Sequence, residues 1–357
     1  MLVTIISFII VLGILIFIHE FGHFITAKKA GIKVEEFALG MGPRLISHKK
    51  GETVYSIRAI PVGGFCNMTG EFPPDADMSE EELKSYEQAK IEGRAFHQQS
   101  IAKKFAVIFM GPFMNFLLAV IIFIFVFSVF GIPVDTSSTT IIGDIVPQQP
   151  ASEAGLKPGD RIISINNNKV AEWKEMSYYI HDAANEEISI KFLRDESEYE
   201  IKLIPEYDES AEGGIIGIFP ELIKEKIGFF NSVKMGVLQT GRVIWLTLNG
   251  FAQMIHERST EGIGGPIAIA SIVGQAARIG IENLLNWMAI ISINLGIINL
   301  LPIPALDGGR LVFIFIEFLR GKPVPAEKEG FVHFIGFVLL ILLMVFFTYK
   351  DIIRTLF

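Results

Sequence analysis

Four long apolar segments dominate the pattern of hydrophobic and polar positions along the chain. They are Met1–Ile18, Phe105–Val134, Asn283–Leu306 and Phe331–Tyr349, and none contains Asp, Glu, Lys or Arg. An apolar helix of about 20 residues crosses the hydrocarbon core of a bilayer. The pattern therefore predicts a polytopic α-helical membrane protein with four transmembrane helices, the first continuing to about residue 24.

A different pattern, typical of a small water-exposed domain, occupies residues 136–212. Short β-rich runs alternate there with turn residues. The predicted strands are Thr140–Val146, Arg161–Ile165, Ile188–Leu193 and Tyr199–Ile204. The stretch ASEAGLKPGDR at Ala151–Arg161 resembles the helix and turn of a PDZ domain. An inserted PDZ (α+β) domain is therefore expected. Such domains bind extended peptides by adding a strand to a sheet edge.

Two further regions flank this domain. Residues 71–94 hold eight acidic residues and a Pro-Pro pair, which is typical of a solvated loop. In the linker at residues 213–282, the apolar run Val243–His256 is too short for a simple span. It predicts an amphipathic helix that is either interfacial or re-entrant.

Composition and charge exclude several classes. The net charge is −8 and no basic stripe occurs, which argues against nucleic-acid binding. The single cysteine, Cys66, excludes a disulfide scaffold. Twelve Lys and Arg residues lie between residues 24 and 104, and none precedes residue 28. By the positive-inside rule this segment is cytoplasmic, as is the connection between the last two spans, whereas the N-terminus and residues 135–282 lie outside.

Ionisable residues at membrane depth are costly and point to function. His19, Glu20 and His23 form the motif H-E-x-x-H at the end of the first apolar segment. On a helix the two histidines share one face and can bind one Zn²⁺, with Glu20 beside the metal to activate water. The pattern predicts a zinc-dependent hydrolase.

A catalytic zinc needs a third protein ligand, and Asp307 is the candidate. It follows Pro302 and Pro304, which break the third apolar segment. Asn299 fits two roles, a donor to a developing oxyanion or an interhelical hydrogen bond. Asn115 could join the second and third spans. His333 is interpreted as an interfacial histidine and not as a ligand.

Together these residues resemble the site-2 protease family of intramembrane zinc metalloproteases, in the bacterial branch of the regulator-of-sigma-E protease. The resemblance rests on HEFGH at 19–23, FALGMGPRL at 37–45, IPVGGF at 60–65, GPFMN at 111–115, the PDZ-like stretch, GGPIAIA at 264–270 and NLLPIPALDGG at 299–309. It implies a membrane-associated β-hairpin near the active site, within residues 33–104. One PDZ domain is visible here, where the Gram-negative prototype carries two.

The resemblance also implies roles for single residues. His19, His23 and Asp307 would bind Zn²⁺, Glu20 would be the catalytic base, and Asn299 would assist near the scissile carbonyl. The residues expected to contact substrate are Pro61, Gly63 and Gly64. Substrates would be single-span membrane proteins, such as anti-sigma factors or remnant signal peptides. The protein would lie among the lipids of a bacterial cytoplasmic membrane, with the metal toward the cytoplasmic side.

An unwound substrate needs a partner for its backbone, and Thr53–Ile60 is the strand expected to supply a free edge. Two other functions remain open from the residues alone. One is a metallopeptidase that cuts soluble or peripheral peptides. The other is a PDZ-bearing membrane receptor or scaffold with a non-catalytic metal site, for which Cys66 could be a fourth ligand.

Overall fold

The chain is divided into two compact units. The computed structural model describes residues 1–71, 80–133, 139–208, 211–221, 224–257 and 264–356. The membrane unit comprises Met1–Ser128 and Gly228–Phe357, and the inserted unit comprises Val129–Ile227. Each unit is described by itself below.

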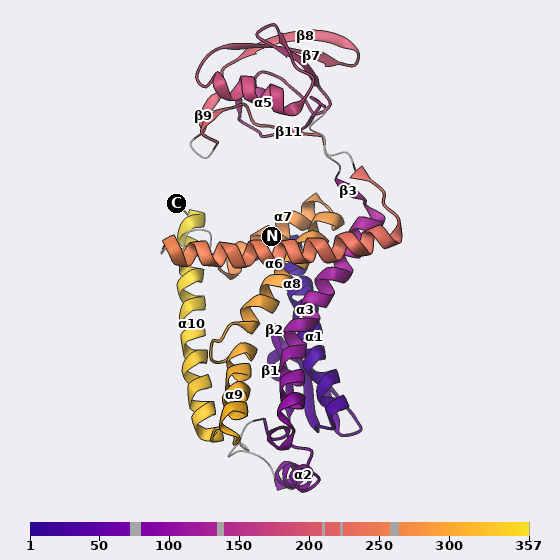
Figure 1. The fold of residues 1–357 in the computed structure, drawn as a ribbon, viewed down its shortest axis with the longest axis vertical. Helices are drawn as coiled ribbons and strands as arrows, with labels where there is room; N and C mark the ends of the chain where they lie inside the picture. The colour runs from indigo at the N-terminus through magenta and orange to yellow at the C-terminus, as the bar shows by residue number, and fades with distance from the viewer. Residues whose placement is uncertain (72–79, 134–138, 209–210, 222–223, 258–263, 357) are drawn as a thin grey trace. The chain divides into compact units, whose positions relative to one another are not determined.

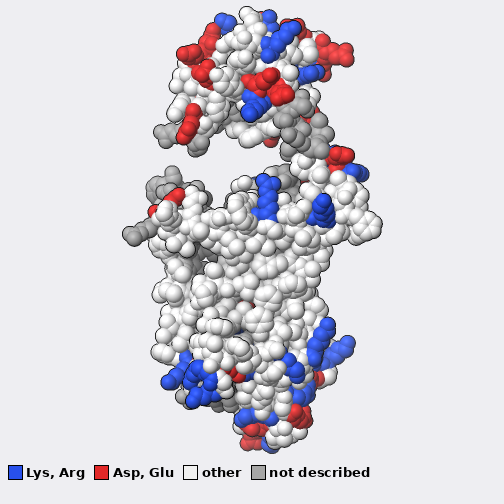
Figure 2. Space-filling model, viewed as in Figure 1, with Lys and Arg blue, Asp and Glu red and all other residues white. Residues whose placement is uncertain are grey.

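The membrane unit is built on apolar helices. Among the described residues, four helices are long and apolar enough to cross a membrane: α1 (Leu2–Ala30), α3 (Ile101–Val129), α8 (Ile281–Leu300) and, within α10 (Ala326–Leu356), residues 328–353. Figure 2 shows a broad band of this unit without charged side chains, with Lys, Arg, Asp and Glu gathered beyond it. The predicted class, a polytopic helical membrane protein, is confirmed.

The third apolar segment ends earlier than its hydropathy predicts. Helix α8 stops at Leu300, and the chain continues as a loop to α9 (Asp307–Arg320). Proline has no amide N–H and cannot continue a helix, so Pro302 and Pro304 end it. The loop folds back tightly, because a Cβ on Gly308 would lie 2.1 Å from the carbonyl oxygen of Leu301.

A bent β-hairpin follows α1. Its strands are β1 (Val34–Lys50) and β2 (Thr53–Met68). Both strands fold over, so Leu39 has Gly64 opposite it on one side and Ile57 on the other. Near these bends Gly40 and Gly63 have φ values of +85° and +84°. Residues with a side chain rarely adopt such positive φ values.

The bending corrects the prediction that Thr53–Ile60 supplies a free edge along its whole length. Residues 54–57 pair with residues 36–39 and also with residues 46–49, so both of their sides are occupied. Within the described chain, the segment Gly64–Met68 pairs on one side only, with Val34–Leu39. The free edge is therefore the second half of β2, a result of tertiary folding that local alternation does not reveal.

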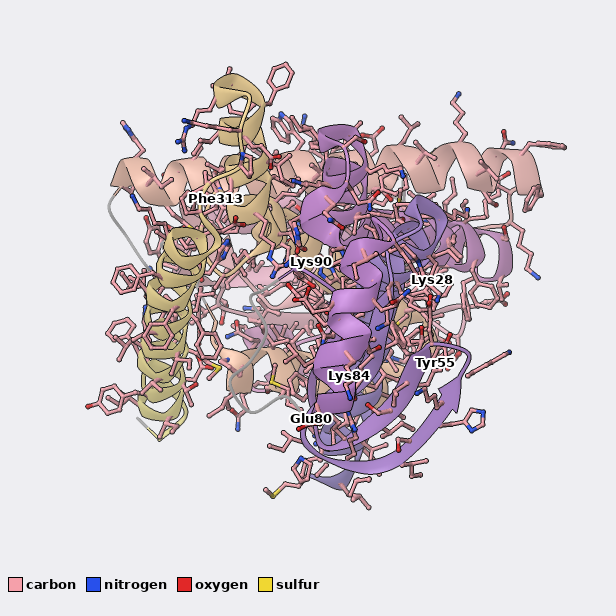
Figure 3. The ribbon with its side chains drawn as sticks, turned by 90° about the horizontal axis from the view of Figure 1, so that it is seen from below. Lys28, Tyr55, Glu80, Lys84, Lys90 and Phe313 are labelled. Atoms are coloured by element: carbon pink, nitrogen blue, oxygen red, sulfur yellow. The ribbon has the colours of Figure 1, made fainter. Side chains whose placement is uncertain are left out.

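The acidic stretch contains a helix, where a solvated loop was expected. Helix α2 (Glu80–Ile91) lies at the end of the membrane unit that carries Lys28 and Tyr55 (Figure 3). Its Tyr86 and Ala89, three residues apart, are buried, so one helical face packs inward. The Lys33 ammonium donates to the Ser85 carbonyl oxygen at 3.1 Å. The first part of the acidic stretch, residues 72–79, is outside the described residues.

Two helices of the linker complete the unit. Helix α6 (Phe229–Glu257) is one helix of 29 residues, longer than the predicted run Val243–His256, and it runs crosswise to α3 and α10 (Figure 1). Its buried stripe includes Gly236, whose Cβ would lie 2.8 Å from Ile124 Cγ1 of α3. Helix α7 (Pro266–Ile279) packs on α1, and its N-terminal amides of Gly265 and Ala268 donate to the Asp351 carboxylate.

The inserted unit combines strands and helices, as expected for an inserted α+β domain. The four predicted strands are confirmed as β4 (Ile142–Ile145), β5 (Arg161–Ile165), β7 (Ile188–Arg194) and β8 (Ser197–Leu203). Its remaining elements are β3 (Ile132–Pro133), α4 (Pro150–Glu153), β6 (Asn168–Lys169), α5 (Trp173–Asp182), β9 (Glu206–Asp208), β10 (Gly213–Ile215), β11 (Ile218–Pro220) and β12 (Lys224–Glu225).

The largest sheet of this unit has the order β6-β5-β7-β8. Met176 and Ile180 of α5 join the buried core with Ile162, Ile165 and Ile190. A cavity of about 330 Å³ lies between α5 and residues 214–219. At the ends of the unit, β3 and β12 pair antiparallel.

Candidate active site

A cavity of about 670 Å³ brings together residues from the two ends of the membrane unit's sequence. Helix α1 contributes His19, Glu20 and His23. The free edge of the hairpin contributes the whole of Gly64–Met68, and the α8–α9 region contributes Asn299 and Asp307. The broken third segment thus returns a carboxylate to a helix nearly 300 residues earlier in the chain.

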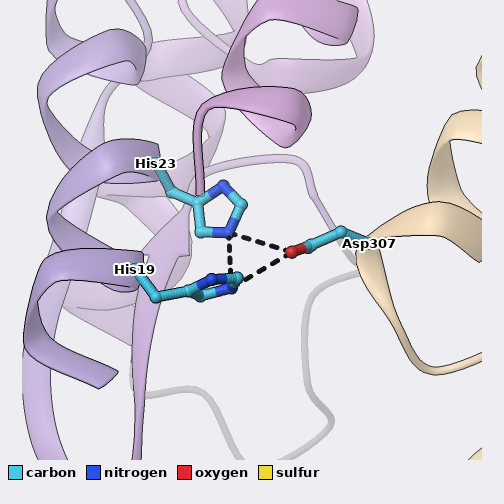
Figure 4. Close-up of side chains that lie close together, drawn as sticks. All are labelled: His19, His23 and Asp307. Atoms are coloured by element: carbon cyan, nitrogen blue, oxygen red, sulfur yellow. Dashed lines mark hydrogen bonds and ion pairs between the residues drawn. The ribbon is translucent and has the colours of Figure 1, made fainter. Parts of the chain in front are cut away.

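Three side chains in this cavity converge on one point (Figure 4). The Nε2 atoms of His19 and His23 are 3.3 Å apart, and Asp307 Oδ2 lies 3.1 Å from the first and 3.5 Å from the second. Zinc binds nitrogen and oxygen at about 2.0–2.2 Å, so tetrahedral ligands lie roughly 3.3–3.5 Å apart. The observed spacings match that triangle, and two nitrogens with one carboxylate oxygen are donors that zinc accepts. The residues therefore fit a zinc ion.

Helix α3 orients both imidazole rings. The carbonyl oxygen of Val107 can only accept, so His23 Nδ1, 2.9 Å away, carries a proton and donates it. The lone pair of His23 Nε2 is then directed into the site. This arrangement fixes the ring orientation and makes the imidazole a better ligand.

Asn115 contacts the other histidine. Its Nδ2 lies 3.1 Å from His19 Nδ1, and its Oδ1 is buried without a hydrogen-bond partner among the described residues. With the amide turned by 180°, Oδ1 would accept a hydrogen bond from the Nδ1–H group of His19, which leaves Nε2 free for a metal. The expected link between the second and third spans also exists, but through the backbone: Ser292 Oγ donates to the Asn115 carbonyl oxygen at 2.8 Å. The role beside His19 was not predicted.

Close helix packing makes these contacts possible. A Cβ on Gly22 would lie 2.4 Å from the carbonyl oxygen of Met110, and one on Gly111 would lie 2.2 Å from His23 Nε2. Small residues let two helix backbones approach in a membrane. Gly111 belongs to the GPFMN motif, which was the only sequence signal for this contact.

The other predicted site residues differ in whether they line the cavity. Glu20 lines it beside Gly64, whose Cβ would be 3.3 Å from Glu20 Cγ, and Asn299 also lines it. Gly63 is not among the lining residues, although it borders Met41, which is. The side chain of Pro61 is outside the described residues.

Two charged residues line the same cavity as His19, His23 and Asp307. Arg310, one turn after Asp307, forms an ion pair with Glu71, and both line the cavity. Burial alone would lower the pKa of Arg310, but the Glu71 carboxylate raises it, so the guanidinium stays charged.

Cys66 does not complete a four-ligand site in the described part of the chain. It lines the cavity but is not part of the cluster of His19, His23 and Asp307. Burial raises the pKa of its thiol far above the ordinary value, which disfavours the thiolate that zinc prefers. The cluster therefore has three donors, the number typical of a catalytic zinc with an open position.

His333, expected at the membrane interface, is buried within the membrane unit. It is 8% exposed and lies outside the donor cluster, in line with its interpretation as a non-ligand. Its Nδ1 accepts a hydrogen bond from the amide of Ala305, two residues before Asp307. Nothing in its local sequence indicates this contact, because 28 residues separate the two.

Comparison with known proteins places these residues in a wider context. Peptidase family M50 matches residues 7–343. The zinc metalloprotease RasP of Geobacillus kaustophilus is 36% identical, with 98% of this chain and 97% of that protein covered. The regulator of sigma-W protease RasP of Bacillus subtilis is 35% identical, with 98% of both covered. Among solved structures, the PDZ domain of an SdrC-like protein from Listeria monocytogenes is 21% identical over 25% of this chain and 93% of that one, with a TM-score of 0.21.

Proposed function

The chain belongs to peptidase family M50 and is a zinc-dependent intramembrane endopeptidase, and from this premise we propose the roles of its residues. His19, His23 and Asp307 hold the zinc ion. Glu20 is the general base, and Asn299 assists near the scissile carbonyl. The receptor or scaffold function has no support from the relatives.

The spacing of the three donor atoms carries this assignment. Their separations of 3.1 to 3.5 Å are close to those expected between zinc ligands, and Glu20 lines the same cavity. A structural site would need a fourth protein ligand and would not need an adjacent glutamate. Three protein donors, which would leave a position for water, together with a nearby base are what hydrolysis requires.

The chain's own groups would act in a short sequence. Zinc, when bound, polarises the scissile carbonyl and lowers the pKa of a water molecule to about 7. Glu20 removes a proton from the attacking water and passes it to the leaving amine. Asn299 donates from its amide to the oxygen that becomes negative. His23 and His19 keep their orientation through Val107 and Asn115.

The hairpin edge would hold the substrate. A transmembrane helix hides its peptide bonds in its own hydrogen bonds, so it has to unwind locally before cleavage. Unwound backbone is costly in lipid unless another strand satisfies it. Gly64–Met68 is paired on one side only and lines the cavity along its length, so it suits strand addition by the substrate. We assign substrate contact to this segment, which begins at Gly64, and to Gly63 and Pro61 just before it.

We further propose single-span membrane proteins, anti-sigma factors among them, as the substrates. The positive charges of residues 24–104 favour a cytoplasmic position for the hairpin and α2, with residues 135–282 outside. The inserted unit then selects substrates and takes no part in the chemistry. Deleting residues 138–210 should change which substrates are cut. If the stable deletion protein cuts no short model helix at all, the purely selective role is wrong.

The test compares the wild type with Glu20→Gln in detergent and in liposomes. Labelled single-span peptides serve as substrates, and zinc is measured on the same samples by mass spectrometry. Wild type should cut within the span, whereas Glu20→Gln should hold about one zinc per chain and not cut. Glu87→Gln, a change on the exposed face of α2, is the matched control and should cut like wild type. Cleavage by Glu20→Gln at the wild-type rate, or a wild type without zinc, would refute the assignment.

A further inference from the structure

We propose that His333 of α10 is a positioning residue for Asp307. It holds the loop before Asp307 in the backbone conformation that presents the carboxylate to His19 and His23. The inference rests on the proposed zinc site, because it concerns how one of its ligands is kept in place.

The loop between α8 and α9 has an unfavourable backbone. Ala305, two residues before Asp307, has φ = +75°, a region that residues with a side chain rarely adopt. Such a conformation persists only when the surroundings impose it. Any relaxation of Ala305 would turn the chain direction immediately before the ligand and move the Asp307 carboxylate.

His333 supplies a contact that opposes this relaxation. The Ala305 amide donates to His333 Nδ1 at 2.8 Å. Because an amide N–H can only donate, Nδ1 must be the acceptor, and the ring proton sits on Nε2. Nε2 faces the Glu329 carboxylate at 3.9 Å, and the ring packs against Phe313 of α9, with 5.5 Å between ring centroids.

The same face of α10 packs against the loop at a second point, Gly336. Gly336 is three residues after His333, and a Cβ there would lie 2.4 Å from the carbonyl oxygen of Pro304. On the α9 side, a Cβ on Gly309 would lie 2.5 Å from the carbonyl oxygen of Ile303. The loop is therefore enclosed on both sides. Within this enclosure His333 makes a directional contact to the strained residue itself.

The test uses the different reach of two amide side chains. In His333→Asn, Oδ1 occupies the position of the imidazole Nδ1 and can accept from Ala305. In His333→Gln the amide lies one carbon farther out and cannot. Phe334→Leu, a change at a 63% exposed residue on the same helix, is the control. The purified full-length proteins are compared by zinc affinity in chelator competition, by kcat and KM for a single-span peptide, and by hydrogen exchange of residues 301–307 without zinc.

We expect His333→Gln to lower zinc affinity and kcat by about 10-fold, as loss of an outer-sphere contact does, with KM unchanged. Exchange in residues 301–307 should accelerate. His333→Asn and Phe334→Leu should match wild type in all three measurements. The inference is overturned if His333→Gln also matches wild type, or if His333→Asn loses as much as His333→Gln, which would indicate packing alone. A wild type that cuts and binds zinc in either case leaves the proposed function standing.

Discussion

Replacing Gly111 with alanine should damage the zinc site although the residue is not a ligand. Gly111 lies in α3 and faces His23 of α1. An added Cβ would lie 2.2 Å from His23 Nε2 and 2.4 Å from Cε1. The substitution thus places one methyl group against the nitrogen proposed to bind zinc.

The size of the effect follows from these distances. Ordinary van der Waals contact begins at 3.4 Å, so the ring or the helix has to retreat by about 1.2 Å, the difference between 3.4 and 2.2 Å. Zinc–ligand distances tolerate only about 0.2 Å. A misplacement of about 1 Å costs on the order of 100-fold in rate. The backbone does not oppose the change, since alanine is favoured over glycine in a helix by about 1 kcal/mol.

The assay measures zinc per chain and cleavage of a single-span peptide for wild type, Gly111→Ala and Gly13→Ala. Gly13, in α1, has no heavy atom within 4 Å of an added Cβ and is the matched control. Gly111→Ala should lose zinc or cleave about 100-fold more slowly while still folding, and Gly13→Ala should match wild type. If Gly111→Ala keeps its zinc and its wild-type rate, the argued contact between α1 and α3 does not govern the site.

Three further predictions concern other contacts. Asn115→Leu should weaken zinc binding by about 10- to 100-fold, whereas Asn115→Asp should not. Chelator competition measures both affinities. Equal zinc affinities for the two variants would exclude the contact with His19. Neighbouring N–H groups of a strand point to opposite sides, so only one of the amides of Phe65 and Cys66 faces the free edge. Each residue is replaced by proline in turn, and only one of the two variants should stop cleavage without lowering the melting temperature. If neither change affects cleavage, substrate does not add to this edge. Arg194→Leu leaves the Asp160 carboxylate, 1% exposed, without its guanidinium and should destabilise the inserted unit by about 3 kcal/mol in a thermal melt, with zinc content unchanged.

The parts of the site that follow from local rules could be predicted from the sequence. The i and i+4 spacing of His19 and His23 places both on one helix face. Uncharged runs identify the spans without knowledge of packing. Two prolines before Asp307 indicate where the third segment breaks.

What the sequence did not predict depends on contacts between distant segments. Asn115 meets His19 across 96 positions, and Ala305 meets His333 across 28. The free edge was assigned to Thr53–Ile60 because alternation marks a strand but not its neighbours, and the folding of β1 over both halves of β2 determined which segment stayed open. Helix α2 was missed because its apolar face consists of few residues in an acidic stretch.

The short ladder between β3 and β12 has a consequence for how such chains change over time. Ile132–Pro133 pairs with Lys224–Glu225, so the inserted unit begins and ends at neighbouring points. A segment whose ends meet can be lengthened, duplicated or exchanged without moving the helices on either side of it. Evolution can therefore alter the inserted unit independently of the membrane helices, and a protein engineer could graft a different domain at the same pair of two-residue strands.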